Sequence, residues 1–195
     1  AECRYLSVVG QDENATIVAQ ELERLKVKNV LVEDNSRPTT FKIRYLVNNQ
    51  KMFRVSRLKE HSLPRQIEDQ IIKELKDAAS QVQGILISDF VYGVITPSIL
   101  KTITELSAKH KLLVFGDLQC SSQVGNVSKF KNFDLLCPTE RESRIALGTR
   151  DEGVEWVANE LMKKTNSRNL VIKLGGEGFI SYESKADGFI NRQHF

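Results

Sequence analysis

The chain has 195 residues, of which 41% are hydrophobic and 27% charged, so it is long enough to form one sizeable domain around its own core. Its formal net charge of +3 is small and its cations are scattered, so the sequence predicts no nucleic-acid partner. No apolar run approaches the ~20 residues of a membrane span, and no signal peptide is visible, so no membrane partner is predicted either. Cys3, Cys120 and Cys137 are widely spaced, which is typical of a reducing, cytoplasmic compartment.

Both ends of the chain indicate a longer protein. The sequence begins at Ala1 without a methionine and runs almost at once into an apolar segment. It ends at Phe195 without a polar tail. We therefore expect residues 1–195 to be an internal piece of a longer domain.

The start of the chain predicts two parallel strands joined by a helix. Residues 5–10 (YLSVVG) and 29–33 (NVLVE) are short apolar segments typical of strands. Between them, residues 14–26 place apolar side chains at helical spacing, and Asp12 can cap this helix. A strand, a helix and a strand within about 30 residues form a βαβ unit, which implies parallel pairing.

Residues 39–58 change to a period of two, which predicts an antiparallel hairpin with its turn at Asn48-Asn49-Gln50. Such an insertion is either an extension of the sheet edge or a lid over a site. Its polar positions include four cations, Lys42, Arg44, Arg54 and Arg57, which form either a solvated face or a grip for an anionic substrate. If its apolar face is exposed, a second copy of the chain is the expected partner.

The later strands share one pattern, in which a short apolar run ends in polar residues or glycine. The central one lies in residues 84–93 (GILISDFVYG), and its apolar run predicts helices against both faces. The pattern recurs at residues 112–117, 135–139 and 170–176, with a returning strand at 179–183 and helices at 64–79, 97–110, 140–147 and 151–165. Because ligands of open α/β sheets bind at the carboxyl ends of the strands, we expect the functional site at that edge.

Three features at the strand ends carry candidate chemistry, and each has a structural alternative. The run Gly175-Gly176-Glu177-Gly178 is either a plain hairpin turn or a backbone nest near a nucleotide. Thr139 and Glu142 have the spacing of a capping box, while Glu142 could also orient Mg²⁺ through water. Asp89 and Asp117 are either ligand contacts or caps of the segments that follow them.

Taken in order, the motifs of this chain resemble those of a known family. They are Pro38-Thr39-Thr40-Phe41-Lys42-Ile43-Arg44, Phe53-Arg54-Val55, Ser88-Asp89-Phe90-x-x-Gly93, Asp117, Pro138-Thr139-x-x-Glu142 and Gly175 to Gly178. This order resembles that of the ribokinase-like (PfkB-type) sugar kinases. Within that family the chain is most similar to the kinase domain of the bacterial heptose-7-phosphate kinases, and the similarity covers nearly its whole length.

The resemblance implies an α/β fold with three α/β/α layers, a mostly parallel sheet and a small β-hairpin lid. Residues 1–195 would be one partial kinase domain, with the lid inserted at residues 39–58. The implied activity is transfer of the γ-phosphate of ATP, with Mg²⁺, to a hydroxyl of a sugar or sugar phosphate, heptose 7-phosphate being one candidate.

The resemblance also implies roles for individual residues. Arg44, Arg54 and Asp89 would face the sugar phosphate. Glu142 would organise Mg²⁺ and the phosphates, in a motif whose first position is Thr139. The nucleotide would lie near Gly175, Gly176 and Gly178.

The chain departs from the family pattern at several points. Thr139 stands where the family has the Asn of Asn-x-x-Glu, and Asp117-Leu118-Gln119 replaces Asp-Pro-Lys, so a basic residue is lost. The Gly-Ala-Gly-Asp motif, which supplies the anion hole and the catalytic base, is absent from residues 1–195. The base is therefore expected beyond Phe195, the family's Gly-Gly substrate motif before residue 1, and no kinase activity from residues 1–195 alone.

Two other interpretations stay open at this point. A non-catalytic sugar- or nucleotide-binding relative would keep the fold and lose the chemistry, and Thr139 and the altered segment after Asp117 favour it. An unrelated doubly wound binding domain would share the strand pattern, but the inserted hairpin argues against it.

Overall fold

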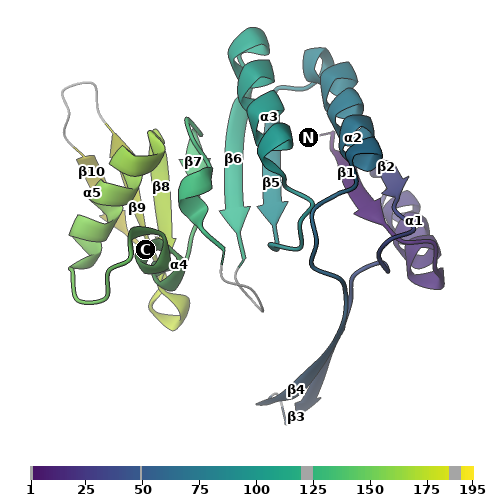
Figure 1. The fold of residues 1–195 in the computed structure, drawn as a ribbon. Helices are drawn as coiled ribbons and strands as arrows, with labels where there is room; N and C mark the ends of the chain where they lie inside the picture. The colour runs from purple at the N-terminus through teal and green to yellow at the C-terminus, as the bar shows by residue number, and fades with distance from the viewer. Residues whose placement is uncertain (1, 49, 120–124, 185–189) are drawn as a thin grey trace. The chain divides into compact units, whose positions relative to one another are not determined.

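The structure is a computed structural model that describes residues 2–48, 50–119, 125–184 and 190–195. Its contacts divide the chain into two compact units. Unit 1 comprises Ala1–Asp77 and Tyr92–Ile99, and unit 2 comprises Ala78–Val91 and Leu100–Phe195. Figure 1 labels the helices and strands of both.

Unit 1 begins with the predicted βαβ arrangement. β1 (Arg4–Val9) pairs in parallel with β2 (Lys28–Glu33), and α1 (Glu13–Arg24) connects them. Asp12 is the N-cap of α1, because its Oδ1 accepts a hydrogen bond of 3.1 Å from the Ala15 amide. The local signals of strand, cap and helix are therefore confirmed.

The predicted hairpin is also present in unit 1. β3 (Phe41–Val47) and β4 (Gln50–Arg57) form a separate antiparallel sheet of two strands, drawn as a two-stranded ribbon in Figure 1. Their register shifts between Tyr45 and Leu46, which marks a β-bulge. Of the predicted turn, Asn49 lies outside the described residues.

Two helices begin in unit 1, each within one residue of its predicted start. α2 (Arg65–Ala78) begins after Pro64, whose carbonyl oxygen accepts hydrogen bonds from the amides of Ile67 and Glu68 at 2.9 and 3.0 Å. α3 (Pro97–His110) starts in unit 1 with proline at its first position, and the Thr96 hydroxyl accepts from the Ile99 amide at 3.2 Å. Proline costs little there because the first turn leaves its amide without a partner.

Unit 2 is built on a sheet of six strands in the order β10-β9-β8-β7-β6-β5. The pairs from β5 to β8 are parallel. β9 is antiparallel to both of its neighbours, β8 and β10. The strands are β5 (Gly84–Asp89), β6 (Leu113–Leu118), β7 (Leu135–Leu136), β8 (Asn169–Lys173), β9 (Phe179–Ser184) and β10 (Ile190–His194). Short 3₁₀ turns lie at η1 (Ala79–Gln81), η2 (Val127–Lys129) and η3 (Gly175–Glu177).

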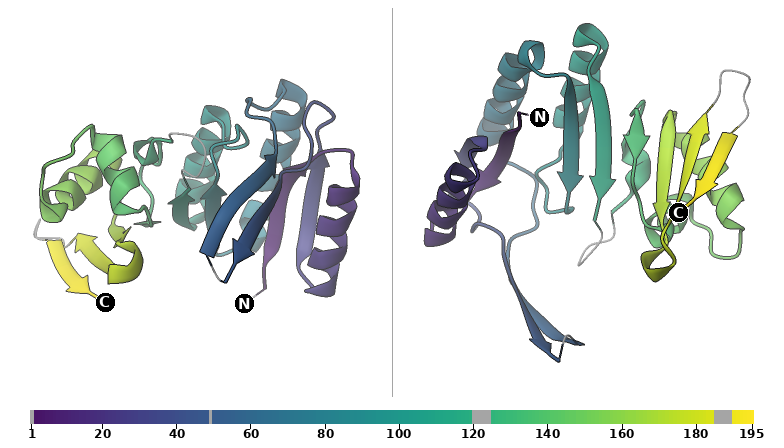
Figure 2. Two further views of the ribbon diagram at one scale, coloured as in Figure 1. Left: turned by 90° about the horizontal axis from the view of Figure 1, so that it is seen from below. Right: turned by 180° about the vertical axis from the view of Figure 1, so that it is seen from behind.

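The helices of unit 2 gather on one face of this sheet. α4 (Glu140–Leu147) and α5 (Val154–Thr165) pack on each other, and both pack against β8. Together with α3 they lie in front of the strands in Figure 1 and behind them in the reverse view of Figure 2. The core beneath them is fully buried and includes Phe130, Phe133, Leu136, Val157, Leu161, Leu170 and Ile172.

Gly116 shows how tightly this core is filled. A β-carbon at this position of β6 would lie 2.9 Å from a ring carbon of Phe133 and 3.0 Å from a methyl group of Leu136. Glycine is therefore required here by the close approach of neighbouring side chains and not by a turn.

The central strand differs from its prediction. The sequence predicted helices against both faces of β5, but within unit 2 the helices cover one face, and β5 is an edge strand of the six-stranded sheet. Alternate side chains of a strand point to opposite faces, so Ile87 is 4% exposed while Leu86 is 73% exposed. An apolar run by itself does not show which of its side chains are covered.

Two further strands differ from expectation. The predicted strand at residues 135–139 is only Leu135–Leu136, because Pro138 has no amide for the ladder and the Thr139 amide bonds a carboxylate. β10 was not predicted, and the loop expected at residues 184–188 lies largely outside the described residues. In the part of the chain that the structure describes, none of the helices has the length and apolar character needed to cross a membrane.

One core residue predicts a pH dependence of stability. Tyr182 on β9 is 2% exposed, and within the described structure its hydroxyl has no hydrogen-bond partner. Burial, followed by the negative charge of Glu155, raises the pKa of Tyr182 to about 12. The folded state therefore favours the protonated phenol, which stabilises the fold below the ordinary pKa of about 10 and ceases to do so as pH rises through 12.

We expect the free energy of unfolding in urea to fall by about 1 kcal/mol between pH 9 and pH 11 through this residue alone. Tyr182→Phe should remove that part of the pH dependence without loss of stability at pH 8, because it deletes an unpaired buried hydroxyl. Urea titrations of the two proteins at both pH values measure the difference. Equal pH slopes would contradict the assignment.

Candidate functional site

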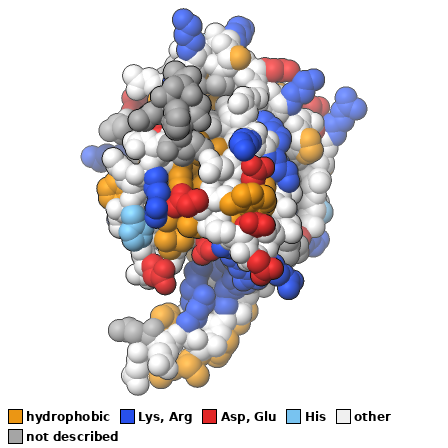
Figure 3. Space-filling model, turned by 90° about the vertical axis from the view of Figure 1, so that its left-hand side faces the viewer, with side chains coloured by type: hydrophobic (Ala, Val, Ile, Leu, Met, Phe, Trp, Pro, Cys, Tyr) orange, Lys and Arg blue, Asp and Glu red, His pale blue; other side chains and the backbone are white. Residues whose placement is uncertain are grey.

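The two predicted arginines of the hairpin face each other across the ladder. Arg44 on β3 is paired with Arg54 on β4, and Lys42, two residues from Arg44, is paired with Ser56. Because alternate residues share a face, Lys42, Arg44 and Arg54 form one cationic face. The hairpin has two feet, an outgoing foot of residues 34–40 before β3 and a returning foot of residues 58–61 after β4. Figure 3 shows Lys and Arg side chains gathered over the hairpin near these feet.

Within the described part of the chain, no acidic side chain pairs with these two arginines. Among the described residues, neither Arg44 nor Arg54 forms an ion pair or hydrogen bond with a carboxylate. Like charges placed directly opposite each other on two strands are destabilising. The arrangement is therefore one that an anion lying between the two guanidinium groups would stabilise.

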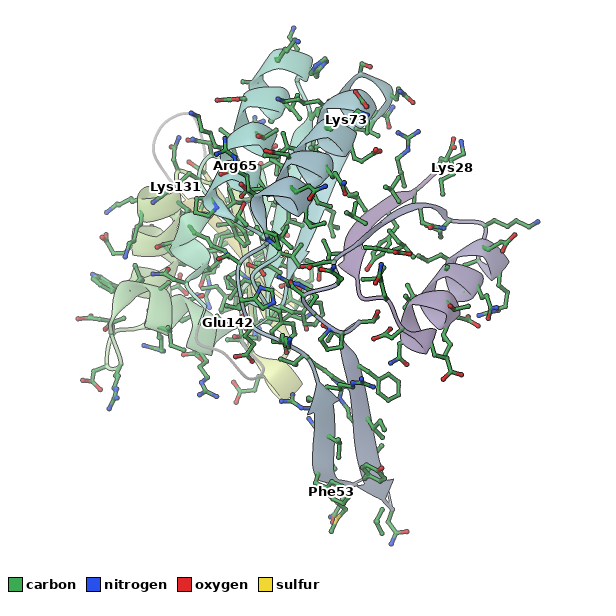
Figure 4. The ribbon with its side chains drawn as sticks, turned by 45° about the vertical axis from the view of Figure 1, so that its right-hand side comes forward. Lys28, Phe53, Arg65, Lys73, Lys131 and Glu142 are labelled. Atoms are coloured by element: carbon green, nitrogen blue, oxygen red, sulfur yellow. The ribbon has the colours of Figure 1, made fainter. Side chains whose placement is uncertain are left out.

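The opposite face of the hairpin is apolar and exposed. Tyr45 and Phe53 stack with their ring centroids 4.4 Å apart, and their exposed fractions are 44% and 56%. Phe53 lies near the far end of the hairpin in Figure 4. Phe41, Ile43 and Val55 share this face and are also exposed. Arg57 is paired with Phe41, so the structure separates it from the other three cations.

Asp89 is held by groups of the protein itself. Its carboxylate is 3% exposed, its Oδ1 accepts a hydrogen bond of 2.8 Å from the Val91 amide, and its Oδ2 forms an ion pair with Lys129. Val91 has a φ of 64°, which is strained for a β-branched residue. Asp89 thus caps the turn that follows β5, as one of its two interpretations predicted, while its contact with a sugar stays a prediction.

Asp117 pairs with a lysine that sequence reasoning missed. Lys173 at the end of β8 places its Nζ 2.7 Å from Oδ1 of Asp117, and Gln119 donates to Oδ2 at 3.3 Å. Burial, followed by the charge of Asp117, raises the pKa of the nearby Cys137 thiol, and Lys173 opposes that shift. The available signal was a single charged residue inside the apolar run LVIKLGG.

Thr139 and Glu142 form the predicted capping box at the start of α4. The Thr139 hydroxyl accepts from the Glu142 amide at 3.2 Å, and the Glu142 carboxylate accepts from the Thr139 amide at 2.8 Å. Glu142, labelled in Figure 4, is 6% exposed. The structural alternative is confirmed for this pair.

The donor set at Glu142 suits magnesium only with help from a ligand. Within the described ranges, no three His, Cys, Asp or Glu side chains lie close enough together to hold a metal ion. Magnesium in phosphoryl-transfer sites takes one or two carboxylates and completes its shell with water and phosphate oxygens. The single carboxylate of Glu142 fits that pattern. It does not provide enough ligands to hold the ion without phosphate and water.

The glycine run after β8 is a turn between two antiparallel strands, as one interpretation predicted. Gly175 has a φ of 68° and Gly178 a φ of 89°, conformations that favour glycine. A β-carbon on Gly178 would also clash with the carbonyl oxygen of Phe195. Gly176 has neither constraint, because its φ is ordinary and the space next to it is open. Of the three, only Gly176 lacks a structural reason to be glycine.

Unit 2 brings most of the predicted residues to one edge of its sheet. Ser88, next to Asp89, is in register with Asp117, and Thr139 forms an isolated bridge with Lys173. The predicted meeting of strand ends is therefore confirmed for β5 to β8. Arg44 and Arg54 belong to unit 1.

A model of the pfkB family of carbohydrate kinases matches residues 1–194. The chain belongs to this family. The bifunctional protein HldE of Trichlorobacter lovleyi is 28% identical over 176 residues, which cover 88% of this chain and 35% of that protein. HldE of Geobacter metallireducens is 31% identical over the same length and coverage. This pfkB-family chain thus spans 35% of the length of these relatives.

Solved structures support the same fold. Ribokinase from Giardia lamblia has a TM-score of 0.73 at 15% identity, over 96% of this chain and 58% of that one. Phosphofructokinase-2 from Escherichia coli in complex with fructose-6-phosphate has a TM-score of 0.70 at 14% identity, over 100% and 62%. The predicted ribokinase-like α/β fold with a small hairpin sheet is confirmed.

Proposed function

We propose that the chain is part of an ATP-dependent sugar or sugar-phosphate kinase, which transfers the γ-phosphate of ATP to a sugar hydroxyl. Membership of the pfkB family supports the reaction class. An anionic sugar substrate is supported by the pairing of Arg44 with Arg54, since neither has a carboxylate partner among the described residues. The motif resemblance makes heptose 7-phosphate the first candidate, and we expect the enzyme in the cytoplasm.

The mechanism assigns the hairpin to substrate binding. Arg44 and Arg54 would hold the anionic end of the sugar by charge-assisted hydrogen bonds, because guanidinium groups match phosphate geometry. Asp89 would orient the sugar from the end of β5, a role that requires it to contact the ligand in addition to the Val91 amide and Lys129.

The nucleotide is proposed to lie at the ends of β7 and β8. The open space beside Gly176 supports a close approach of phosphate, and Gly175 and Gly178 shape that turn. Bound Mg²⁺ would neutralise charge that develops on the transferring phosphate. Glu142 would orient the ion through water, while Thr139 keeps that carboxylate in place through the capping box.

A non-catalytic relative that binds a sugar or nucleotide is the second candidate. The acidic side chains favour this candidate, because Asp89, Asp117 and Glu142 all accept hydrogen bonds from other groups of the protein. Such a protein would keep the hairpin and its arginines without turning over ATP.

The activity is tested with the full-length protein in a coupled assay of ADP release, with ATP, Mg²⁺ and a panel of sugars and sugar phosphates. We expect turnover with a phosphorylated sugar and none with residues 1–195 alone, because these residues contain no Gly-Ala-Gly-Asp motif for the anion hole and base. If the full-length protein releases no ADP with any sugar of the panel, the non-catalytic relative is favoured. Turnover by residues 1–195 would show that the base lies within them.

Arg44→Ala in the full-length enzyme should raise the KM for the phosphorylated sugar far more than the KM for ATP. The loss of a charge-assisted contact costs about 1.5–3 kcal/mol, which corresponds to about 10- to 100-fold. Arg57→Ala is the matched control, because it removes the same charge from the opposite face of the same hairpin. Steady-state kinetics with each substrate varied in turn provide both constants.

The two variants separate a specific contact from a general effect of charge. If Arg44→Ala leaves the sugar KM unchanged, the hairpin does not bind the anionic end. If Arg57→Ala has an equal effect, the hairpin attracts anions by net charge and the assignment to one face is wrong.

We also propose that two copies of the chain associate through the apolar face of the hairpin. Phe41, Ile43, Tyr45, Phe53 and Val55 are each between 37% and 56% exposed on a two-stranded sheet without further strands among the described residues. An exposed apolar strand surface of this kind favours association. A second copy supplies a surface of the same shape and chemistry, which suits a two-fold symmetric contact.

Phe53→Ser should therefore shift the full-length protein from dimer to monomer. Trp156→Ser is the control, since Trp156 is 43% exposed but lies on α5 of unit 2. Analytical ultracentrifugation over a range of concentrations measures the dissociation constant of each. A wild-type protein that sediments as a monomer throughout, or a variant that dimerises like wild type, would exclude this interface.

A further inference from the structure

A buried arginine lies at the feet of the hairpin and is not part of the proposed binding surface. Arg37 precedes β3, and its side chain is 6% exposed. Its Nε donates to Oδ2 of Asp34 at 2.8 Å, and that carboxylate is 1% exposed. Burial opposes ionisation of Asp34, but hydrogen bonds from Ser36 and Arg37 outweigh it and lower the pKa. The pair is thus a buried ion pair with its hydrogen bonds satisfied.

The other nitrogens of Arg37 reach two separate segments. Nη2 donates to the carbonyl oxygen of His61 at 2.8 Å and lies 3.2 Å from its Nδ1, so it holds the segment that returns from β4. Nη1 donates to the carbonyl oxygen of Tyr92 at 3.0 Å. The adjacent Gly93 lies so close to the His61 carbonyl that a β-carbon would clash with it. One guanidinium group therefore joins the outgoing foot, the returning foot and residues 92–93.

The outgoing foot has a second attachment. The Gly10 amide donates to the Thr39 hydroxyl at 2.9 Å, and the Thr39 amide donates to Oδ2 of Asp12 at 3.0 Å. The returning foot is joined to the outgoing one by Arg37, by a contact of 3.5 Å between the Ser36 hydroxyl and Nε2 of His61, and by an exposed bond of 2.9 Å from Lys59 to the Ser36 carbonyl. The bond of 2.8 Å from Arg37 to the His61 carbonyl is the shortest of these links and is half-buried, so the position of β4 depends most on Arg37.

Arg37 also contacts the surroundings of the cationic face. The Tyr92 carbonyl bonds Arg37, and Nζ of Lys42 lies 4.7 Å from the centroid of the Tyr92 ring. Lys42 shares the face of Arg44 and Arg54. The contacts of Arg37 thus extend from both feet to the residue beneath that face.

We propose that Arg37 is a positioning residue for substrate recognition, which holds both feet of the hairpin so that Arg44 and Arg54 meet one anion together. This inference rests on the proposed function of those two arginines. A planar guanidinium with five donors can satisfy three segments at once, whereas a lysine ammonium in the same place cannot reproduce that fork.

The test uses Arg37→Lys in the full-length enzyme, which keeps the charge and removes the fork. We expect the KM for the phosphorylated sugar to rise about tenfold, with kcat and the KM for ATP within about twofold of wild type. Arg65→Lys is the matched control, since Arg65, labelled in Figure 4, is 93% exposed on α2. Amide hydrogen exchange should become faster in residues 41–57 of Arg37→Lys and should not change in Arg65→Lys.

A double-mutant comparison separates positioning from a loss of stability. In a protein that already carries Arg44→Ala and Arg54→Ala, adding Arg37→Lys should change the sugar KM by less than about twofold, because the groups that it positions are gone. A further tenfold rise in that background, or an equal rise in the KM for ATP, would overturn the inference.

Failure of this inference and failure of the proposed function give different results. If Arg44→Ala raises the sugar KM but Arg37→Lys does not, Arg37 is not a positioning residue and the proposed function stands. If Arg44→Ala has no effect, the assignment of the arginines fails, and this inference fails with it. Should Arg37→Lys not fold, Asp34→Asn, which keeps the shape of the side chain and removes its charge, must show the same selective rise in smaller size.

Discussion

Parallel pairing of β5, β6, β7 and β8 is the constraint on which the candidate site depends. Strands that run in one direction place their carboxyl ends at one edge of the sheet, and this brings Asp89, Asp117 and Lys173 to the same edge. The helices of unit 2 cover one face, so Gly116 and Ile172 are turned into the core. Their neighbours Asp117 and Lys173 are therefore turned to the other face, where they pair. The packing that fills the core also sets the geometry of the ion pair.

In the hairpin, too, alternate side chains point to opposite faces, but here neither face is buried in a core. On one of its faces Arg44 and Arg54 have no carboxylate partner among the described residues, and on the other face the apolar side chains are exposed. A two-stranded sheet is only marginally stable by itself, so its orientation depends on how its feet are held. Arg37, Thr39 and Asp12 supply that support through buried and half-buried bonds. Feet held in this way suit the binding role proposed for the hairpin, because an element that is ordered before its ligand arrives loses less entropy on binding.

Local signals in the sequence were sufficient for most elements. Asp12, Thr96 and Thr139 start helices because a side-chain oxygen meets an amide within three residues, and a period of two is a local property of a hairpin. The register of the strand ends followed from parallel topology. The family and the fold were predicted from the order of the motifs and are confirmed.

The partners of the charged residues were not predictable in this way. Asp89 meets Lys129 across 40 positions and Asp117 meets Lys173 across 56, and no local pattern links residues so far apart. The two ion pairs also differ in the free energy needed to separate their partners. Asp89 is 3% exposed and would leave a buried charge, whereas Lys173 and Asp117 are 37% and 28% exposed, so water can replace either partner. A phosphate group at this edge would therefore displace Asp117 from Lys173 more easily than it would displace Asp89 from Lys129.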